Sequence, residues 1–359
     1  MTEATPQPRA TVAAIGAYVP GRPPTPRPGL TTYRLSSNEN PYPPLPGVLE
    51  AATRAAATLN RYPDMATTAL YDALSRKHDV APDQLVAATG SVALIYQLLG
   101  AFCEPGDEVV HAWRSFEAFP IAIAVAGAVS VPVALTPDGR HDLAAMAAAV
   151  TERTKVVLVC TPNNPTGPAV TQSELDAFLA AVPGHVLVMV DEAYLEFVRM
   201  ADRVDGVATM RAHPNVVVTR TFSKAYGLAG LRIGYAVAHP MLAAALRAVS
   251  LPFGVSQVAQ EAAIASLAAE AELLARVEEL VAERTRVLAG VRATGWRIPD
   301  AQGNFVWFPA GDRALELAAA AEELGITVRP FAGDGVRATI GEAPANDRLI
   351  ELAQKVVSP

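Results

Sequence analysis

The sequence predicts an α/β protein whose large domain holds a mostly parallel, seven-stranded sheet between layers of helices, with a smaller α+β domain beside it. Two observations predict this class. Apolar runs such as VVLV at 156–159 and VLVMV at 186–190 are continuous, which is typical of strands covered on both faces. Helical patterns separate these runs, and such alternation indicates a parallel sheet.

The first part of the chain is expected to be extended. Residues 1–46 contain 11 of the 29 prolines, a density that excludes a continuous helix and disfavours a central strand. We therefore predict an extended arm over residues 1–30, with a loose tail as an equally good interpretation of residues 1–15.

Residues 47–252 are expected to form the large domain, because strands and helices alternate there. The expected strands are 85–88, 108–112, 131–134, 155–159, 186–190, 216–219 and 233–238. The expected helices are 47–60, 66–78, 92–103, 143–150 and 173–181.

Residues 31–46 and 253–359 are expected to form the small domain. Residues 256–288 are rich in Ala, Leu, Glu and Arg and lack proline, which predicts one long or broken helix. Short strands are expected at 304–308, 326–329 and 336–340, with helices at 313–324 and 346–356.

Composition excludes several classes of function. The 359 residues carry a net charge of −7, whereas nucleic-acid binding normally needs a basic surface. Two cysteines, Cys103 and Cys160, cannot form a disulfide framework or a Cys-based zinc site, and the six histidines are scattered. No signal pattern or membrane-length apolar run is visible, so we expect a cytoplasmic protein.

Lysine is rare in this chain and therefore informative. Only four of the 29 basic residues are lysines, at positions 77, 155, 224 and 355, and arginine cannot replace lysine in forming a Schiff base with an aldehyde. Lys224 follows a buried-type strand in the segment TRTFSKAYGLAGLRIG. Because α/β sheets bind ligands at the carboxyl ends of their strands, Lys224 is a candidate catalytic residue, with a surface lysine as the alternative.

Other strand ends carry polar residues as well. Asp191 directly follows a buried strand, where a carboxylate needs either a partner or a function; capping a helix is the alternative role, and Tyr194 could point into the same crevice. Asn164 lies in the tight turn TPNNPTG. Gly90 and Ser91 open a helix with free N–H groups that suit an anion. Together these turns indicate one site at one edge of the sheet.

These motifs, with SSNENPYPP, NRYPD and VRATIG, resemble pyridoxal-phosphate aminotransferases of fold type I. The resemblance covers nearly the whole chain and is closest to the histidinol-phosphate aminotransferase branch and its aromatic-amino-acid relatives in actinobacteria. It implies pyridoxal 5'-phosphate as the cofactor and a homodimer. Arg114 stands where the family often has proline.

The resemblance implies a role for each matching residue. Lys224 would hold the cofactor and then move the proton at the substrate Cα, and Asp191 would keep the pyridine nitrogen protonated. The other cofactor contacts would come from Tyr194, Asn164, Phe116, Ser91, Val92, Thr221, Ser223 and Arg232, while Tyr62 would reach the phosphate in the other subunit. Arg337 would grip the substrate α-carboxylate, and further substrate contacts are expected from Asn38, Asn40, Tyr42, Tyr18 and Arg329, besides Asn164.

We therefore predict a transaminase that moves an amino group between an aromatic L-amino acid and a 2-oxo acid, with 2-oxoglutarate as the expected acceptor. Histidinol-phosphate transamination is the main alternative, because an arginine near Arg329 contacts substrate phosphate in that branch. A lyase or decarboxylase on the same fold, and a non-enzymatic regulator, are the remaining alternatives.

Overall fold

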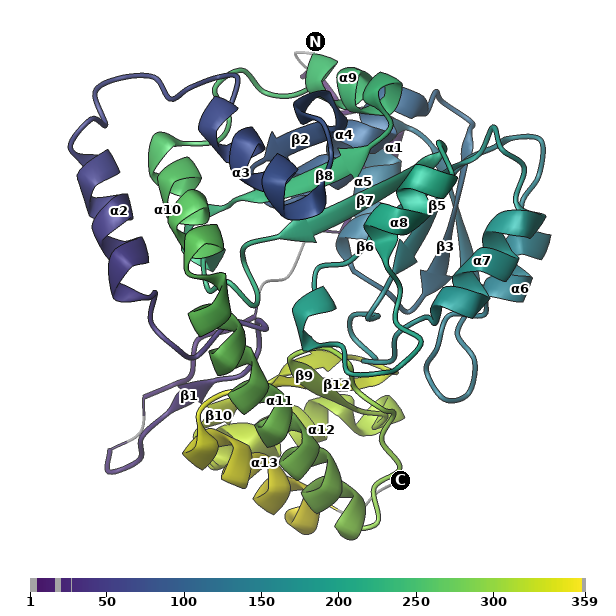
Figure 1. Ribbon diagram of the computed structural model, residues 1–359. Coiled ribbons are helices and arrows are strands. Elements are labelled where there is room, and N and C mark those ends of the chain that lie inside the picture. The colour runs from purple at the N-terminus through teal and green to yellow at the C-terminus, as the bar shows by residue number, and fades with distance from the viewer. Residues whose placement is uncertain (1–4, 17–20, 27, 357–359) are drawn as a thin grey trace.

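The computed structural model describes residues 5–16, 21–26 and 28–356, and Figure 1 follows the chain through two layered parts. Tyr18, which we expected near the substrate, lies outside the described residues. Among the described residues, no helix combines the length and the apolar character needed to cross a membrane.

A seven-stranded sheet forms the centre of the larger part, in the order β2-β8-β7-β6-β5-β3-β4. β8 is antiparallel to both neighbours, whereas the other pairs are parallel. The strands are β2 (Leu85–Ala88), β3 (Glu108–Trp113), β4 (Val129–Ala134), β5 (Thr154–Cys160), β6 (Leu187–Asp191), β7 (Val216–Thr221) and β8 (Gly234–Ala238). The predicted mostly parallel sheet is therefore confirmed.

Helices cover both faces of this sheet. The helices of this part are α2 (Pro46–Ala56), α3 (Thr68–His78), α4 (Ser91–Phe102), α5 (Ala118–Ala126), α6 (Leu143–Ala148), α7 (Gln172–Ala181), α8 (Gly206–Ala212) and α9 (Pro240–Ala248). In β5, Val156 and Leu158 pack with α4 and α5, while Val157 and Val159 pack into the core on the opposite face. Burial on both faces explains why the strand sequences are continuously apolar.

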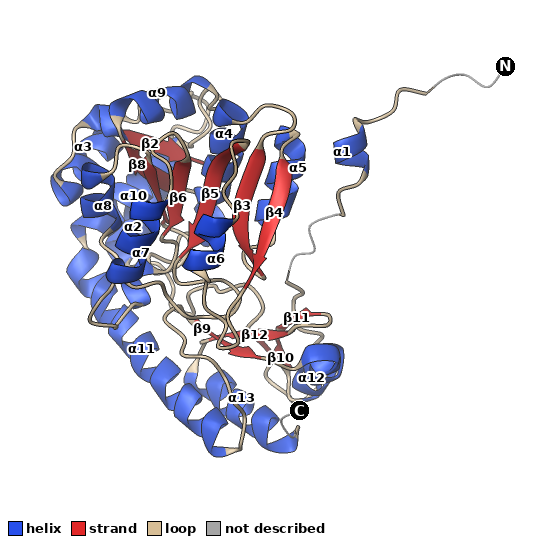
Figure 2. Ribbon diagram, turned by 90° about the vertical axis from the view of Figure 1, so that its right-hand side faces the viewer, coloured by secondary structure: helices blue, strands red, loops and turns tan. Residues whose placement is uncertain are grey.

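A second sheet lies beyond the carboxyl ends of the large one (Figure 2). It is antiparallel, in the order β11-β12-β9, and is formed by β9 (Phe305–Phe308), β11 (Arg329–Phe331) and β12 (Gly335–Thr339). The helices that follow the large sheet are α10 (Gln257–Ala268), α11 (Glu270–Ala293), α12 (Ala314–Glu323) and α13 (Ala343–Lys355). α10 packs on α2 and α3, whereas α11 packs on α13.

The early chain joins this second part. β1 (Tyr33–Arg34) pairs in parallel with β10 (Ile326–Thr327). Leu35 extends the pairing, because its N–H donates to the Thr327 carbonyl and its own carbonyl accepts from the N–H of Thr339, each at 2.8 Å. Backbone hydrogen bonds therefore join segments that lie about 300 residues apart in the sequence.

The structure also differs from several sequence predictions. The strand expected at 326–329 is split into β10 and β11, which belong to different sheets. The helix expected at 256–288, long or broken, takes the broken form, with the break at Ala269 and the second part running on to Ala293. The extended arm contains a short helix, α1 (Ala10–Ala13), in a stretch from 9 to 16 that lacks proline. α1 lies against α5, and Arg9 donates to the Val125 carbonyl at 2.6 Å. Helices α5, α8 and α9 were not predicted.

Candidate active site

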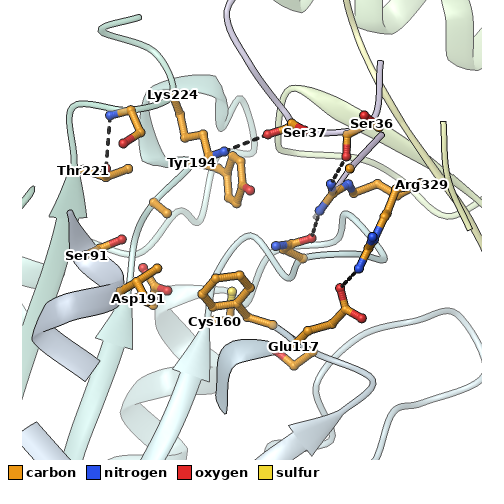
Figure 3. Close-up of a pocket in the computed structure, with 18 of the residues that line it drawn as sticks. Ser36, Ser37, Ser91, Glu117, Cys160, Asp191, Tyr194, Thr221, Lys224 and Arg329 are labelled. Atoms are coloured by element: carbon orange, nitrogen blue, oxygen red, sulfur yellow. Dashed lines mark hydrogen bonds and ion pairs between the residues drawn. The ribbon is translucent and has the colours of Figure 1, made fainter. Parts of the chain in front are cut away.

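A cavity of about 230 Å³ opens between the carboxyl ends of β5, β6 and β7 and the hairpin of β11 and β12 (Figure 3). The predicted site residues that line it are Ser91, Val92, Phe116, Asn164, Asp191, Tyr194, Thr221, Ser223, Lys224, Arg232, Arg329 and Arg337. Most of them follow the carboxyl ends of the parallel strands, which lie at one edge of the large sheet, whereas Arg329 and Arg337 belong to β11 and β12 of the antiparallel sheet.

Lys224 reaches into this cavity from the turn after β7. Its Nζ donates to the carbonyl oxygens of Ser37 and Asn38 at 3.1 and 3.3 Å. Burial, reinforced by the positive charges of Arg337 and Arg232, lowers the pKa of the Lys224 amine to about 7. The amine is therefore largely uncharged just above neutral pH, and an uncharged amine is the form that attacks an aldehyde.

Asp191 ends β6 and is 4% exposed. The Thr219 hydroxyl donates to its Oδ1 at 3.3 Å. Burial is the main cause that raises the pKa of the Asp191 carboxyl to about 6. The next helical turn, Leu195–Phe197, begins after Tyr194, so Asp191 is not its N-cap. A buried carboxylate in this position is suited to hold a cationic partner.

The N-terminus of α4 forms an anion cradle with Arg232. A Cβ on Gly90, whose φ is +83°, would lie 2.6 Å from Nη2 of Arg232. A Cβ on Gly234 would lie 2.5 Å from the backbone nitrogen of Ser91. Both glycines are therefore needed for the close approach of β8 and Arg232 to the first N–H groups of the helix. Arg232 also donates to the Ser223 hydroxyl at 3.3 Å.

Polar side chains from the early chain and from β12 complete the wall. Asn38 donates from Nδ2 to the Tyr194 hydroxyl at 2.9 Å. Arg337 donates from Nη1 to Oδ1 of Asn164 at 2.5 Å and from Nη2 to the Ser36 carbonyl at 2.7 Å. Burial raises the pKa of the Tyr194 phenol above its usual value, so the phenol keeps its proton as a donor.

The opposite side of the cavity is formed by Glu117, Arg329 and Phe331. Arg329 donates from Nη2 to Oε2 of Glu117 at 2.7 Å (Figure 3), and its guanidinium lies over the Phe331 ring, 5.5 Å from the centroid. Phe116 lines the cavity next to Glu117 and packs edge-on against Phe119.

Four described residues that were predicted for the site are absent from the cavity lining. They are Asn38, which contacts Tyr194 as given above, and Asn40, Tyr42 and Tyr62. Asn40 donates to the Ala225 carbonyl at 2.9 Å, and Tyr42 donates to Glu279 at 2.6 Å. Tyr62 is 82% exposed and stacks on Phe253, with ring centroids 4.6 Å apart.

Sequence reasoning also missed several lining residues, namely Gly21, Ser36, Ser37, Ser115, Glu117, Cys160, Ala193 and Phe331. Glu117 had a usable signal, since it is an acidic residue beside Phe116 in WRSFEAF. Ser36 and Ser37 act through backbone carbonyls, which carry no residue-type signal.

The sequence of the chain is similar to one protein family and to several named proteins. Residues 31–351 match the model of the family "Aminotransferase class I and II". The chain is 56% identical over 355 residues to an aromatic amino acid aminotransferase from Streptomyces coelicolor, covering 99% of both chains. It is 51% identical over 346 residues to a protein of the same name from Thermobifida fusca, covering 96% of both.

Solved structures agree with this assignment. The histidinol-phosphate aminotransferase from Sinorhizobium meliloti, in complex with pyridoxal-5'-phosphate, superposes with a TM-score of 0.88 at 28% identity, covering 99% of this chain and 98% of that one. The aspartate aminotransferase from Thermus thermophilus with maleate gives a TM-score of 0.82 at 25% identity over 92% of both chains. The chain therefore belongs to the aminotransferase class I and II family.

Proposed function

We propose that this protein is a pyridoxal-phosphate-dependent transaminase that moves the amino group between an aromatic L-amino acid and a 2-oxo acid, with 2-oxoglutarate as the acceptor. The observation that carries the reaction type is the meeting of Lys224, Asp191 and Arg337 in one cavity. The aromatic substrate is supported by the Streptomyces coelicolor relative, which is 56% identical over 99% of both chains.

The side chains of the cavity fit this cofactor. Lys224 is the one lysine of the four in the sequence that lines the cavity, and its lowered pKa favours attack on an aldehyde. The cradle of Gly90, Ser91 and Arg232 suits a phosphate, because helix N–H groups and a guanidinium both bind anions. Asp191 suits a protonated ring nitrogen.

Each residue then has a defined task. Bound pyridoxal phosphate would supply an electron sink for the electron pair left when the substrate loses its α-proton. Lys224 would take that proton from the substrate Cα at Nζ and would then deliver it to the cofactor. Asp191 would hold the proton on the ring nitrogen, and Tyr194 and Asn164 would hydrogen-bond the ring oxygen. Arg337 would orient the substrate through its α-carboxylate.

A substrate panel on the purified holoenzyme tests the substrate class. We expect phenylalanine and tyrosine to exceed histidinol phosphate in kcat/KM by at least about 100-fold, a difference of roughly 2.7 kcal/mol. The amino products are measured with 2-oxoglutarate as the acceptor. A reversed ranking would make histidinol phosphate the substrate, and release of CO2 in place of a new oxo acid would end the transaminase proposal.

Histidinol phosphate is the second candidate because of the Sinorhizobium meliloti structure, at 28% identity. To reach Arg329, the phosphate of this substrate would have to displace the Glu117 carboxylate that the arginine already contacts.

We further propose that the protein is a homodimer in which Tyr62 completes the phosphate site of the other subunit. Large apolar side chains are exposed around Tyr62, namely Leu59, Met65, Leu251 and Phe253. An exposed group of this kind is typical of a subunit interface.

We also propose the domain division that the sequence predicts. It consists of an arm at 1–30, a cofactor-binding domain at 47–252 and a small domain at 31–46 and 253–359. A cytoplasmic location is proposed as well.

Mixing two inactive variants tests the position of Tyr62. In a hybrid of Lys224→Ala and Tyr62→Ala subunits, one site would combine an intact lysine with an intact tyrosine from the other chain. We therefore expect the mixture, refolded at limiting cofactor, to regain activity that neither variant has alone. If Tyr62 served its own subunit, no hybrid site would be intact and no activity would return. Tyr96→Ala, which replaces another exposed tyrosine, serves as the control for Tyr62→Ala.

A further inference from the structure

Two arginines of the cavity face each other across the hairpin. Arg329 on β11 and Arg337 on β12 are directly opposed residues of an antiparallel pair. Side chains at opposed positions lie on the same face of a sheet, and like charges there destabilise the pair unless other groups balance them. Both residues are 8% exposed and both line the cavity, so groups other than bulk water must balance much of their charge.

The two arginines have different contacts. Arg337 donates to the neutral Oδ1 of Asn164 and to the carbonyl of Ser36. Arg329 is paired with the Glu117 carboxylate at 2.7 Å. An acid of the protein therefore balances the charge of Arg329.

Glu117 is placed so that a substrate can compete with it. It precedes the first residue of α5, its side chain is 29% exposed, and it lines the same cavity as both arginines. The pair is therefore partly exposed at the cavity, and a ligand carboxylate that replaced the Glu117 carboxylate would keep Arg329 paired. Phe116 and Phe331 line the same cavity, and the Arg329 guanidinium lies over the Phe331 ring, so aromatic rings border the ion pair.

We propose that Glu117 sets the side-chain selectivity of this enzyme by competing with the distal anion of a substrate for Arg329. With the pair closed, the wall accepts an uncharged aromatic side chain. A ligand with a second anionic group, such as a dicarboxylate or a phosphate ester, must displace Glu117 to reach Arg329. This inference rests on the proposed transaminase function and adds the residue that separates its two candidate substrates.

A purely mechanical role for this ion pair is the competing explanation, because a second pair joins the same two segments. Arg114 donates from Nε to Oδ2 of Asp334 at 2.5 Å, and Asp334 lies in the turn between β11 and β12. Neither residue lines the cavity. Asp334→Asn therefore weakens the hold of the hairpin on the 113–117 loop without changing the charge facing the ligand, and it is the matched control.

The test compares the Glu117→Gln and Asp334→Asn holoenzymes with the parent. Glutarate serves as the probe, because it has two carboxylates but neither an amino nor an oxo group and therefore cannot react. We expect Glu117→Gln to lower the glutarate Kd, measured by calorimetry, about tenfold, the scale of one charge-assisted hydrogen bond. The KM for 2-oxoglutarate should fall in parallel, and kcat/KM for histidinol phosphate should rise about tenfold. The kcat/KM for phenylalanine should not rise, because its side chain carries no anion that could pair with Arg329, and adding Arg329→Gln should remove the gains.

The possible outcomes separate cleanly. An unchanged glutarate Kd in Glu117→Gln, or an equal change in Asp334→Asn, would overturn the role of Glu117. Persistence of the gain after Arg329→Gln would overturn it as well, since the competition would then not involve that arginine. Failure of the proposed function shows elsewhere, as a parent enzyme that prefers histidinol phosphate or transfers no amino group, whereas the glutarate measurement does not depend on turnover.

Discussion

Replacing Lys224 with alanine should reduce transamination by at least about 10⁴-fold, since positioned proton transfer alone contributes up to about that factor. The covalent link to the cofactor would be lost in addition. No other lysine lines the cavity, so none can take over. Borohydride reduction of the holoenzyme followed by peptide mapping should label Lys224 in the parent and no residue in the variant. The variant should also lose the absorption band of the lysine-bound cofactor at the boundary between the ultraviolet and the visible range.

The control for this change is Lys155→Ala, which removes an exposed lysine at the start of β5 and should keep full activity. Lys224→Arg gives a second comparison, because arginine keeps a positive charge but cannot bond to an aldehyde. We expect it to be as inactive as alanine. A label on a different lysine, or substantial turnover by either Lys224 variant, would contradict the assignment.

The second large effect is expected from Asp191→Asn. Asparagine nearly preserves the shape but cannot balance a positive charge on the ring nitrogen. Removing one preorganised electrostatic partner costs about 10²–10³ in kcat, or roughly 2.7–4 kcal/mol. We therefore expect kcat to fall by about this factor while the cofactor stays bound, which single-turnover kinetics and cofactor absorbance can measure together.

Asp205→Asn is the matched control for this variant. Asp205 accepts from the N–H of Ala208 as the N-cap of α8, and asparagine caps a helix about as well as aspartate. Both its stability and its activity should therefore stay near those of the parent. A near-normal kcat in Asp191→Asn would contradict the proposed role, because the negative charge of the carboxylate would then not be needed for catalysis.

The sheet could be predicted because its strands are buried on both faces and their sequences are therefore continuously apolar. β2 was expected over the residues that it occupies, and the other central strands differ only at their ends. The missed helix α5 reads AFPIAIAVA, which is apolar all around and shows no helical period. The split between β10 and β11 could not be predicted either, since it depends on which distant partners, β1 and β12, the two halves meet.

The candidate site divides in the same way. Lys224, Asp191 and Ser91 were predictable from local sequence, because each follows a buried strand and the carboxyl ends of parallel strands converge. The pairing of Glu117 with Arg329 spans 212 residues, so no local pattern contains it. The same holds for the carbonyls of Ser36 and Ser37, which depend on how the early chain crosses the cavity.

The pairing of Leu35 and Asn38 with the region around Thr339 has a consequence for biosynthesis. Asn38 and Thr339 are 301 residues apart, and translation adds about 5–20 residues per second. The newly made N-terminal portion must therefore wait roughly 15–60 s before the strand that completes its pairing emerges from the ribosome. Much of the central sheet can form during that interval, but the wall that contacts Lys224 and Arg337 is assembled last. The complete cofactor site therefore forms only after residue 339 has been synthesised.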